Sequence, residues 1–266
     1  MSIRYLRATS ILAILLLISL SMACAPVSQQ SATVGTGGPD PKAEQEDSIP
    51  KASVWLSKWQ AEKPKAGGIL VKGQGNTAPS LDTIAEGTIG THMISMLSYN
   101  TLLEYQYDAS DEVGFPSKIV PALAEKWEQS KDGMTYTFNL RKGVKWHDGK
   151  EFTSADAAYS IQRIMEPPPK MPSLRQGWYK GVVDKIETPD AYTFVIRLSD
   201  VDAAFIQKIA AGYTPMVPKH VLEPFNSRIG TTDADKVVGT GPFKLVKAER
   251  DIGYELRKNE NYWKQG

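Results

Sequence analysis

Residues 121–164 read PALAEKWEQSKDGMTYTFNLRKGVKWHDGKEFTSADAAYSIQRI, and this stretch carries the clearest structural signals of the chain. Its first half predicts a β-hairpin. Residues 134–140 alternate between apolar and polar side chains, and they follow the run 126–130 after the turn Lys131-Asp132-Gly133. Asp-Gly between two such runs is a strong hairpin signal, because glycine readily adopts the positive φ that the turn requires.

The second half of the same stretch predicts another turn and then a helix. The turn is His147-Asp148-Gly149, and the pair Thr153 and Asp156 has the spacing of a capping box, which begins a helix. Three consecutive prolines, 167–169, end that helix because proline cannot donate a main-chain hydrogen bond. The apolar stripe at helical spacing consists of Ala157, Ile161, Ile164 and Met165.

Alternating strand and helix signals extend on both sides of this stretch and predict an α/β fold for residues 67–266. Before it, Gly68 to Gln74 predicts a first strand, and a helix is predicted from Thr91. The apolar face expected for this helix consists of Met93, Met96 and Leu97.

After the stretch, a second hairpin is predicted from residues 182–188 and 192–198, which flank Pro189-Asp190-Ala191. A helix carrying Phe205 and Ile209 follows, with Asp202 as its expected cap. The last predicted strands are Phe243 to Val246 and Tyr254 to Arg257.

Composition places the chain among ordinary globular proteins. Of its 266 residues, 41% are apolar and 23% are charged, and the formal net charge is +1. The chain has no excess of basic residues, so its charge does not indicate a nucleic-acid partner. Cys24 is the single cysteine, so an intrachain disulfide or a zinc site with paired cysteines is excluded.

Residues 1–24 have the organisation of an export signal. Arg4 and Arg7 precede the apolar run 11–20, and small residues stand at Ser21 and Ala23, directly before Cys24. Three interpretations are open. The segment is a lipoprotein-type signal peptide whose cysteine is lipidated, an ordinary cleaved signal, or an uncleaved anchor, since residues 8–28 are uncharged and long enough to span a membrane. Each of them predicts an extracytoplasmic location.

Residues 25–66 are predicted to be a flexible tether. They lack periodicity, and SQQSATVGTGGPDP at 28–41 is too polar to offset the entropy of ordering. An apolar cluster, Val54 to Trp59, interrupts this segment and is expected to dock on the folded body or at the membrane surface.

Four stretches, in order, resemble the bacterial extracellular solute-binding proteins of family 5, the peptide- and nickel-binding components of ABC importers. The resemblance covers the amino-terminal half of that family. The stretches are residues 67–83 (GGILVKGQGNTAPSLDT), 99–104 (YNTLLE), 121–164, and 238–263, which contains VGTGPFKLV and ends in NENYW.

The resemblance implies a two-lobed, periplasmic-binding-protein type II-like α/β fold with an α+β domain inserted in the first lobe. It assigns residues 67–100 and 181–266 to lobe I and residues 101–180 to the inserted domain. A whole second lobe follows in the family, and it is expected to be absent from this chain, which ends at Gly266. Ligands of the family are enclosed between the two lobes.

Polar residues after the first predicted strand are candidates for ligand contact, because ligands of open α/β sheets bind near strand ends. Gln74, Asn76 and Thr77 can donate hydrogen bonds to a carbonyl or carboxylate. The alternative is that these side chains bond the main chain of their own loop.

Four further candidates lie later in the chain. Met216 stands near the end of another predicted strand, where it either contacts a ligand or packs in the core. By resemblance, Gly239, Thr240 and Gly241 lie in the segment that leads toward the hinge of the family. Two glycines in this segment permit close backbone approach or unusual φ and ψ angles, so a structural turn is the alternative to a ligand or hinge role.

No catalytic constellation is present in the sequence. GxSxG, HExxH and phosphate-binding glycine motifs are absent, and the adjacent His147 and Asp148 belong to a predicted turn. The sequence therefore predicts no enzyme, cofactor or metal. The resemblance implies a solute-binding component of an ABC importer, with peptides as the leading ligand, permease subunits as partners and a lipid anchor in the membrane. The alternative is a truncated, lipid-tethered interaction or sensor protein that keeps the fold without binding a ligand tightly.

The leader generates a direct prediction. Mass spectrometry of the membrane-extracted protein should show an amino terminus at an acylated Cys24, with residues 1–23 removed. A soluble product with a free Cys24 thiol would contradict it.

Overall fold

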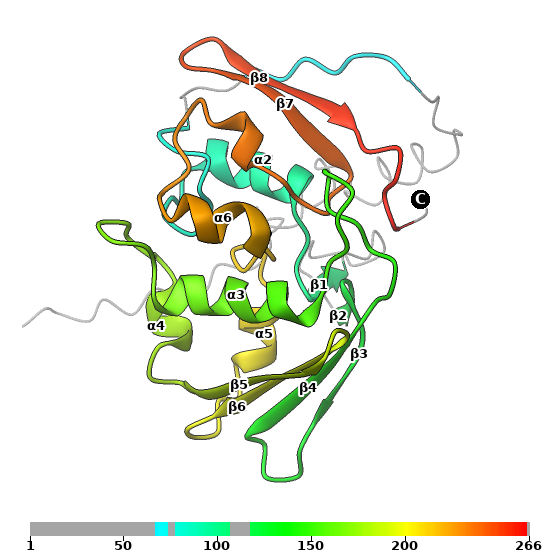
Figure 1. Ribbon diagram of the computed structural model, residues 1–266, viewed down its shortest axis with the longest axis vertical. Coiled ribbons are helices and arrows are strands. Elements are labelled where there is room, and N and C mark those ends of the chain that lie inside the picture. The colour runs from blue at the N-terminus through cyan, green and yellow to red at the C-terminus, as the bar shows by residue number, and fades with distance from the viewer. Residues whose placement is uncertain (1–66, 74–77, 107–117, 265–266) are drawn as a thin grey trace, which may run out of the picture. The chain divides into compact units, whose positions relative to one another are not determined.

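The computed structural model describes residues 67–73, 78–106 and 118–264 (Figure 1). The predictions for the leader, Cys24, the tether and the loop residues Gln74, Asn76 and Thr77 concern parts of the chain outside these ranges. The helices are α2 (Ile89–Ser98), α3 (Ser154–Met165), α4 (Gln176–Tyr179), α5 (Phe205–Ala210) and α6 (Lys219–Phe225), with a 3-10 turn η1 (Ala234–Lys236). The strands are β1 (Leu103–Gln106), β2 (Lys118–Pro121), β3 (Ala124–Gln129), β4 (Thr135–Leu140), β5 (Val183–Asp190), β6 (Thr193–Leu198), β7 (Phe243–Glu249) and β8 (Gly253–Lys258).

A four-stranded antiparallel sheet is built from the two predicted hairpins, in the order β3-β4-β6-β5. Both hairpins are confirmed, and Gly133 has a φ of 76° in the first turn. The two central strands bury every second side chain, as the alternation predicts. The two edge strands carry charged residues and a proline, which discourages pairing with further strands. The buried side chains of the central strands are Tyr136, Phe138, Leu140, Phe194, Ile196 and Leu198.

Helix α3 packs against β5 and β6 and closes one side of this core (Figure 1). The predicted cap is present, because the Thr153 N–H donates to Asp156 Oδ2 at 3.0 Å. Ala157, Ile161 and Ile164 are completely buried, as the predicted stripe requires. The helix ends at Met165, directly before the proline run.

The predicted domain boundary between residues 180 and 181 lies between β4 and β5, so it assigns strands of this one sheet to two different domains. Strand β5 begins at Val183, and β6 pairs with β4 from Thr135↔Arg197 to Asn139↔Thr193. A division at 180 would separate hydrogen-bonded strands of one core, so a boundary after β6 fits the hydrogen bonding better. The assignment of domains itself stays a proposal.

A second hydrophobic cluster lies between α2, α6 and the β7–β8 hairpin, and the last predicted strands are confirmed. The helix predicted from Thr91 is confirmed as α2, but its predicted apolar face is wrong, since Met96 is 59% exposed. The buried face carries mostly small side chains, and at the carboxy-terminal end of the helix the main chain of residues 239–241 lies directly against Leu97 and Ser98. The buried residues of α2 are Gly90, Thr91, Ile94, Ser95 and Ser98.

The predicted first strand is also corrected by the structure. Residues 67–73 have no strand geometry, and Ile69, Leu70 and Val71 are 92%, 93% and 87% exposed. A strand is stable only when it is paired, and none of the described residues pairs with this segment.

One buried ion pair connects distant parts of the fold. Arg163 of α3 donates from Nη2 to Asp82 Oδ2 at 2.8 Å, and the two side chains are 1% and 3% exposed. The same Asp82 carboxylate accepts the N–H of Ile84 at 3.1 Å and that of Ile229 at 3.3 Å. Arg163 also donates to the Ser227 carbonyl at 2.8 Å. The pair thus links α3 to the loop before α2 and to the segment after α6.

We expect Arg163→Met to lower the free energy of unfolding by about 3–5 kcal/mol, because it leaves the buried Asp82 carboxylate without its cation. Urea denaturation followed by circular dichroism measures the change. Lys258→Gln is the matched control: its ion pair with Glu260 joins side chains that are 73% and 75% exposed. The control should cost less than about 1 kcal/mol. Equal losses in both variants would contradict the prediction.

Candidate functional site

The predicted turn at residues 147–149 brings His147 against the segment 239–241, which is far away in sequence. The His147 N–H donates to the Gly239 carbonyl at 2.8 Å. The imidazole makes two further contacts with the same segment, from Nδ1 to the Gly239 nitrogen and from Nε2 to the Gly241 carbonyl, both at 3.1 Å. Lys244 of β7 donates from Nζ to the His147 carbonyl at 2.8 Å. The turn and this segment therefore form one hydrogen-bonded unit.

The partners of the imidazole define its tautomer. The Gly239 N–H can only donate, so Nδ1 accepts, and Nε2 carries the proton that is donated to the Gly241 carbonyl. Burial lowers the pKa of His147. The Gly241 carbonyl opposes this, the Lys244 ammonium lowers the pKa further, and the Asp148 carboxylate raises it. The neutral ring is thus the form that this site favours.

Gly239 and Gly241 allow the segment to touch the carboxy-terminal end of α2. A Cβ atom on Gly239 would lie 1.7 Å from the Ser98 carbonyl oxygen, and one on Gly241 would lie 2.7 Å from the Leu97 oxygen. The Gly241 N–H instead donates to the Ser98 carbonyl at 2.9 Å. Of the two reasons for glycine in this segment, close backbone approach is therefore the one that applies, since neither glycine has a positive φ.

Asn100, directly after α2, joins the remaining candidate residues to this unit. Its Oδ1 accepts the Thr240 hydroxyl at 3.1 Å and the Trp263 indole N–H at 3.2 Å. Its carbonyl accepts the Met216 N–H at 2.9 Å. Met216 and Thr240 are both completely buried. Asn259 completes the unit by donating to the Gly241 carbonyl at 3.0 Å.

The structure thus brings Met216, Gly239, Thr240 and Gly241 together around Asn100, and it buries all four. Met216 packs within the core of the four-stranded sheet. The main chain of the glycine segment is hydrogen-bonded to three other parts of the chain, at His147, Ser98 and Asn259. Ligand contact by these four residues, and by the loop residues outside the described ranges, stays a prediction.

A second contact at the same turn was missed by sequence reasoning. His220 of α6 lies 2.6 Å from Asp148, between Nε2 and Oδ2. Partial burial raises the pKa of the Asp148 carboxyl, but hydrogen bonds from His220 and from the Lys150 N–H outweigh it and hold that pKa below its usual value. Within the described ranges, no hydroxyl or thiol is hydrogen-bonded to His220. The pair is therefore an Asp–His contact without a nucleophile.

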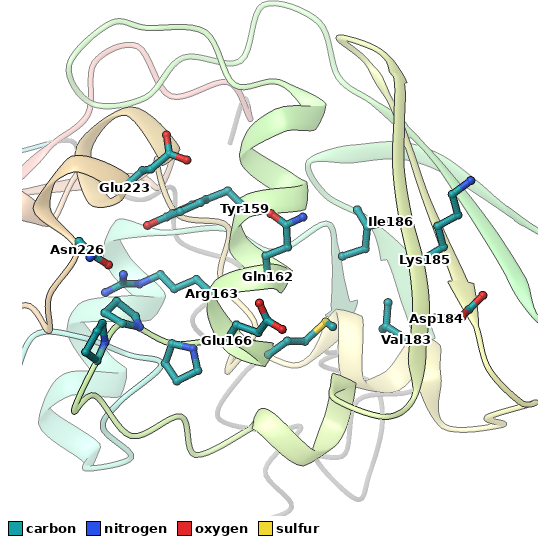
Figure 2. Close-up of a pocket in the computed structure, with 14 residues that line it drawn as sticks. Tyr159, Gln162, Arg163, Glu166, Val183, Asp184, Lys185, Ile186, Glu223 and Asn226 are labelled. Carbon is teal, nitrogen blue, oxygen red and sulfur yellow. The ribbon is translucent and has the colours of Figure 1, made fainter.

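A groove lies on the outer face of α3, between α6 and β5 (Figure 2). Its volume is roughly 690 Å³, with Tyr159, Gln162 and Glu166 of α3 along its floor and the proline run 167–169 at one end. The charged residues of its walls are largely paired, Glu223 with Lys219 and Lys185 with Glu187. The groove is thus a mixed polar surface, formed by elements that only the fold brings together.

Two negative findings apply to the described residues. No three His, Cys, Asp or Glu side chains in the ranges 67–73, 78–106 and 118–264 are grouped so that they could hold a metal ion. Across the same ranges, none of the helices combines the length and the apolar character needed to cross a membrane.

Comparison with known proteins gives a consistent result. A family model described as "Bacterial extracellular solute-binding proteins, family 5 Middle" matches residues 118–266. The chain is 33% identical over 197 residues to the heme-binding protein A of Haemophilus influenzae, which covers 68% of this chain and 34% of that protein. It is 31% identical over 163 residues to di/tripeptide-binding protein 1 of Pseudomonas aeruginosa, covering 56% and 30%. The chain spans about a third of the length of these relatives.

Two solved structures resemble the described fold. The PBP AgaA of A. tumefaciens R10, in complex with agropinic acid, has a TM-score of 0.60 and 32% identity, over 71% of this chain and 35% of that one. The periplasmic binding protein DppA of Helicobacter pylori, in complex with the peptide STSA, has a TM-score of 0.56 and 26% identity, over 71% and 39%. The expected fold class, a mixed α/β portion of a type II periplasmic binding protein, is confirmed.

The close approach of the glycine segment to α2 can be tested directly. Gly239→Ala should lower the free energy of unfolding by at least about 3 kcal/mol, because its methyl group would overlap the Ser98 carbonyl. Gly177→Ala is the control, since no atom lies within 4 Å of the position of its added methyl group. Chemical denaturation of both variants should show a change of less than about 1 kcal/mol for the control. A Gly239→Ala protein as stable as the control would refute the packing argument.

Proposed function

The chain belongs to the family 5 bacterial extracellular solute-binding proteins, and from this premise we propose that it captures peptides, or related small solutes, for an ABC importer. In this role it lies outside the cytoplasm, is held at the membrane by a lipid on Cys24, and delivers its ligand to permease subunits. It acts without a cofactor, and it releases the ligand chemically unchanged.

The observation that carries the proposal is the family match over residues 118–266. Peptides are favoured as the ligand because similar proteins include di/tripeptide-binding protein 1 and a DppA solved with the peptide STSA. Other relatives are named for heme or were solved with agropinic acid, so non-peptide solutes are the nearest alternatives.

The geometry supports binding rather than catalysis. The family consists of solute-binding transport proteins. The titratable groups described at the candidate site are engaged in structural contacts: His147 with the glycine segment, and His220 with Asp148. In the proposed function the glycine segment is the rigid support at the hinge side of lobe I, and Gln74, Asn76 and Thr77 supply hydrogen bonds to the ligand.

Calorimetric titration of this chain together with the second lobe that the family has, against a library of di-, tri- and tetrapeptides, tests the proposal. We expect saturable binding, and mass spectrometry of the recovered peptides should show no cleavage. Heme and agropinic acid serve as the non-peptide probes. Binding of either one alone would overturn the choice of peptides, and cleavage products would overturn the assignment as a binding protein.

A variant separates contact with the ligand from folding. Asn76→Ala should weaken peptide binding about three- to tenfold, the effect of losing one neutral hydrogen bond. Asn261→Ala, at an exposed position after β8, is the matched control and should leave the affinity unchanged. A well-folded protein with both lobes that binds none of the probes would favour the alternative function, a lipid-tethered interaction or sensor protein.

A further inference from the structure

The imidazole of His147 is the point at which the 145–151 hairpin meets the glycine segment. Its Nδ1 accepts the Gly239 N–H and its Nε2 donates to the Gly241 carbonyl, so one ring spans the two glycines. The Gly241 carbonyl has a second donor in Asn259, whereas among the described residues the Gly239 N–H has His147 as its acceptor. The contact at Nδ1 is therefore the one that cannot be replaced.

The charge of the ring decides whether this contact exists. In the imidazolium both nitrogens carry protons, so Nδ1–H would point at the Gly239 N–H, donor against donor. Gly239 is buried, and its N–H would then lose its acceptor without gaining water in exchange. The segment cannot move away easily, because it already contacts the Ser98 main chain on its other side.

The charged groups around the ring do not reverse this preference. From β7, the Lys244 ammonium binds the His147 carbonyl and disfavours a second positive charge. From the hairpin itself, Asp148 favours the cation, but it is engaged by His220 of α6 at 2.6 Å. From the end of α2, the buried Tyr99 lies beside Gly239, and burial raises its pKa far above neutrality, so it stays uncharged.

We infer that His147 is a positioning residue: as a neutral imidazole with its proton on Nε2, it fixes the Gly239–Gly241 segment, and its protonation in acid breaks the Nδ1 contact and destabilises the fold around that segment. A role for this loss in the ligand site rests on the proposed function, in which the segment supports the hinge side of lobe I. The structural step does not depend on a ligand.

The direction of the pH dependence follows from the preference for the neutral ring. Above the ordinary histidine pKa of about 6.5, His147 is neutral in both the folded and the unfolded chain, and its contribution to stability is complete. Below that pH the unfolded chain binds the proton first. The folding equilibrium constant should then fall by up to about tenfold per pH unit, until the folded protein binds the proton too.

Nitrogen-15 NMR of the full chain, labelled at histidine, reads the tautomer directly. The chain has three histidines, so Asn substitutions at His92, His147 and His220 assign the three rings. We expect the Nε2–H tautomer for His147 at pH 7 and a titration midpoint below that of an ordinary histidine. An Nδ1–H tautomer, or a midpoint at or above the ordinary value, would overturn the inference.

The stability profile provides the second test. His147→Asn places an amide oxygen where Nδ1 stands, whereas His147→Leu removes both contacts. The folding equilibrium constant of the wild-type chain should decline from pH 7 to 5 more steeply than that of either variant, and at pH 7 the Asn variant should be the more stable of the two.

Repeating the comparison in a His220→Gln background isolates the ring, because that change removes the contact with Asp148. The His147-dependent decline should persist there, and it should be somewhat shallower, because an Asp148 carboxylate freed from His220 favours the imidazolium. Parallel pH profiles for the wild type and His147→Leu would sink the inference. Neither measurement needs a ligand, so a chain that binds no peptide still gives a clear answer. Failure of the proposed function can therefore be distinguished from failure of the inference about His147.

Discussion

The arrangement of the two hydrophobic clusters depends on the ion pair between Asp82 and Arg163. One carboxylate accepts hydrogen bonds from α3, from the loop before α2 and from the segment after α6. A charge in a nearly dry interior is tolerated only when its hydrogen bonds replace the lost water, and here the carboxylate has three donors. Because these donors come from separate stretches of chain, the pair also holds the four-stranded sheet and the α2–β7–β8 region in a defined relation. The contacts of the glycine segment with His147 and with α2 depend on this placement of the two regions.

The elements that sequence reasoning predicted well are those whose causes are local. The turn at Gly133, the capping box at Thr153 and the alternation along β4 each involve residues close together in the chain, so the pattern and the structure have the same origin. The apolar stripe on α3 is also a local pattern, because its residues recur at helical spacing and pack together against one side of the sheet. These signals were sufficient for both hairpins and for α3, whereas the type II periplasmic-binding-protein fold was implied by the resemblance to the family.

The errors occurred where distant segments decide the outcome. The apolar run in residues 68–74 predicts a strand, but pairing is a property of two segments, and the run alone does not show whether a partner strand lies beside it. The carboxy-terminal end of α2 packs against the main chain of two glycines that lie more than 140 residues later, and the sequence of the helix alone does not show this contact. The double role of His147 was likewise hidden. A histidine in a turn carries no sign of the main-chain groups that fold onto its ring.

The strand order β3-β4-β6-β5 has a consequence for how the protein folds. Each hairpin joins strands that are neighbours in sequence, so both can form early at a small cost in loop closure. The pairing of β4 with β6 is different, because it must bring together Asn139 and Thr193 across the whole of α3 and α4. Non-local pairing of this kind slows folding more than local pairing does. Docking one finished hairpin onto the other is therefore the expected rate-limiting step for this core.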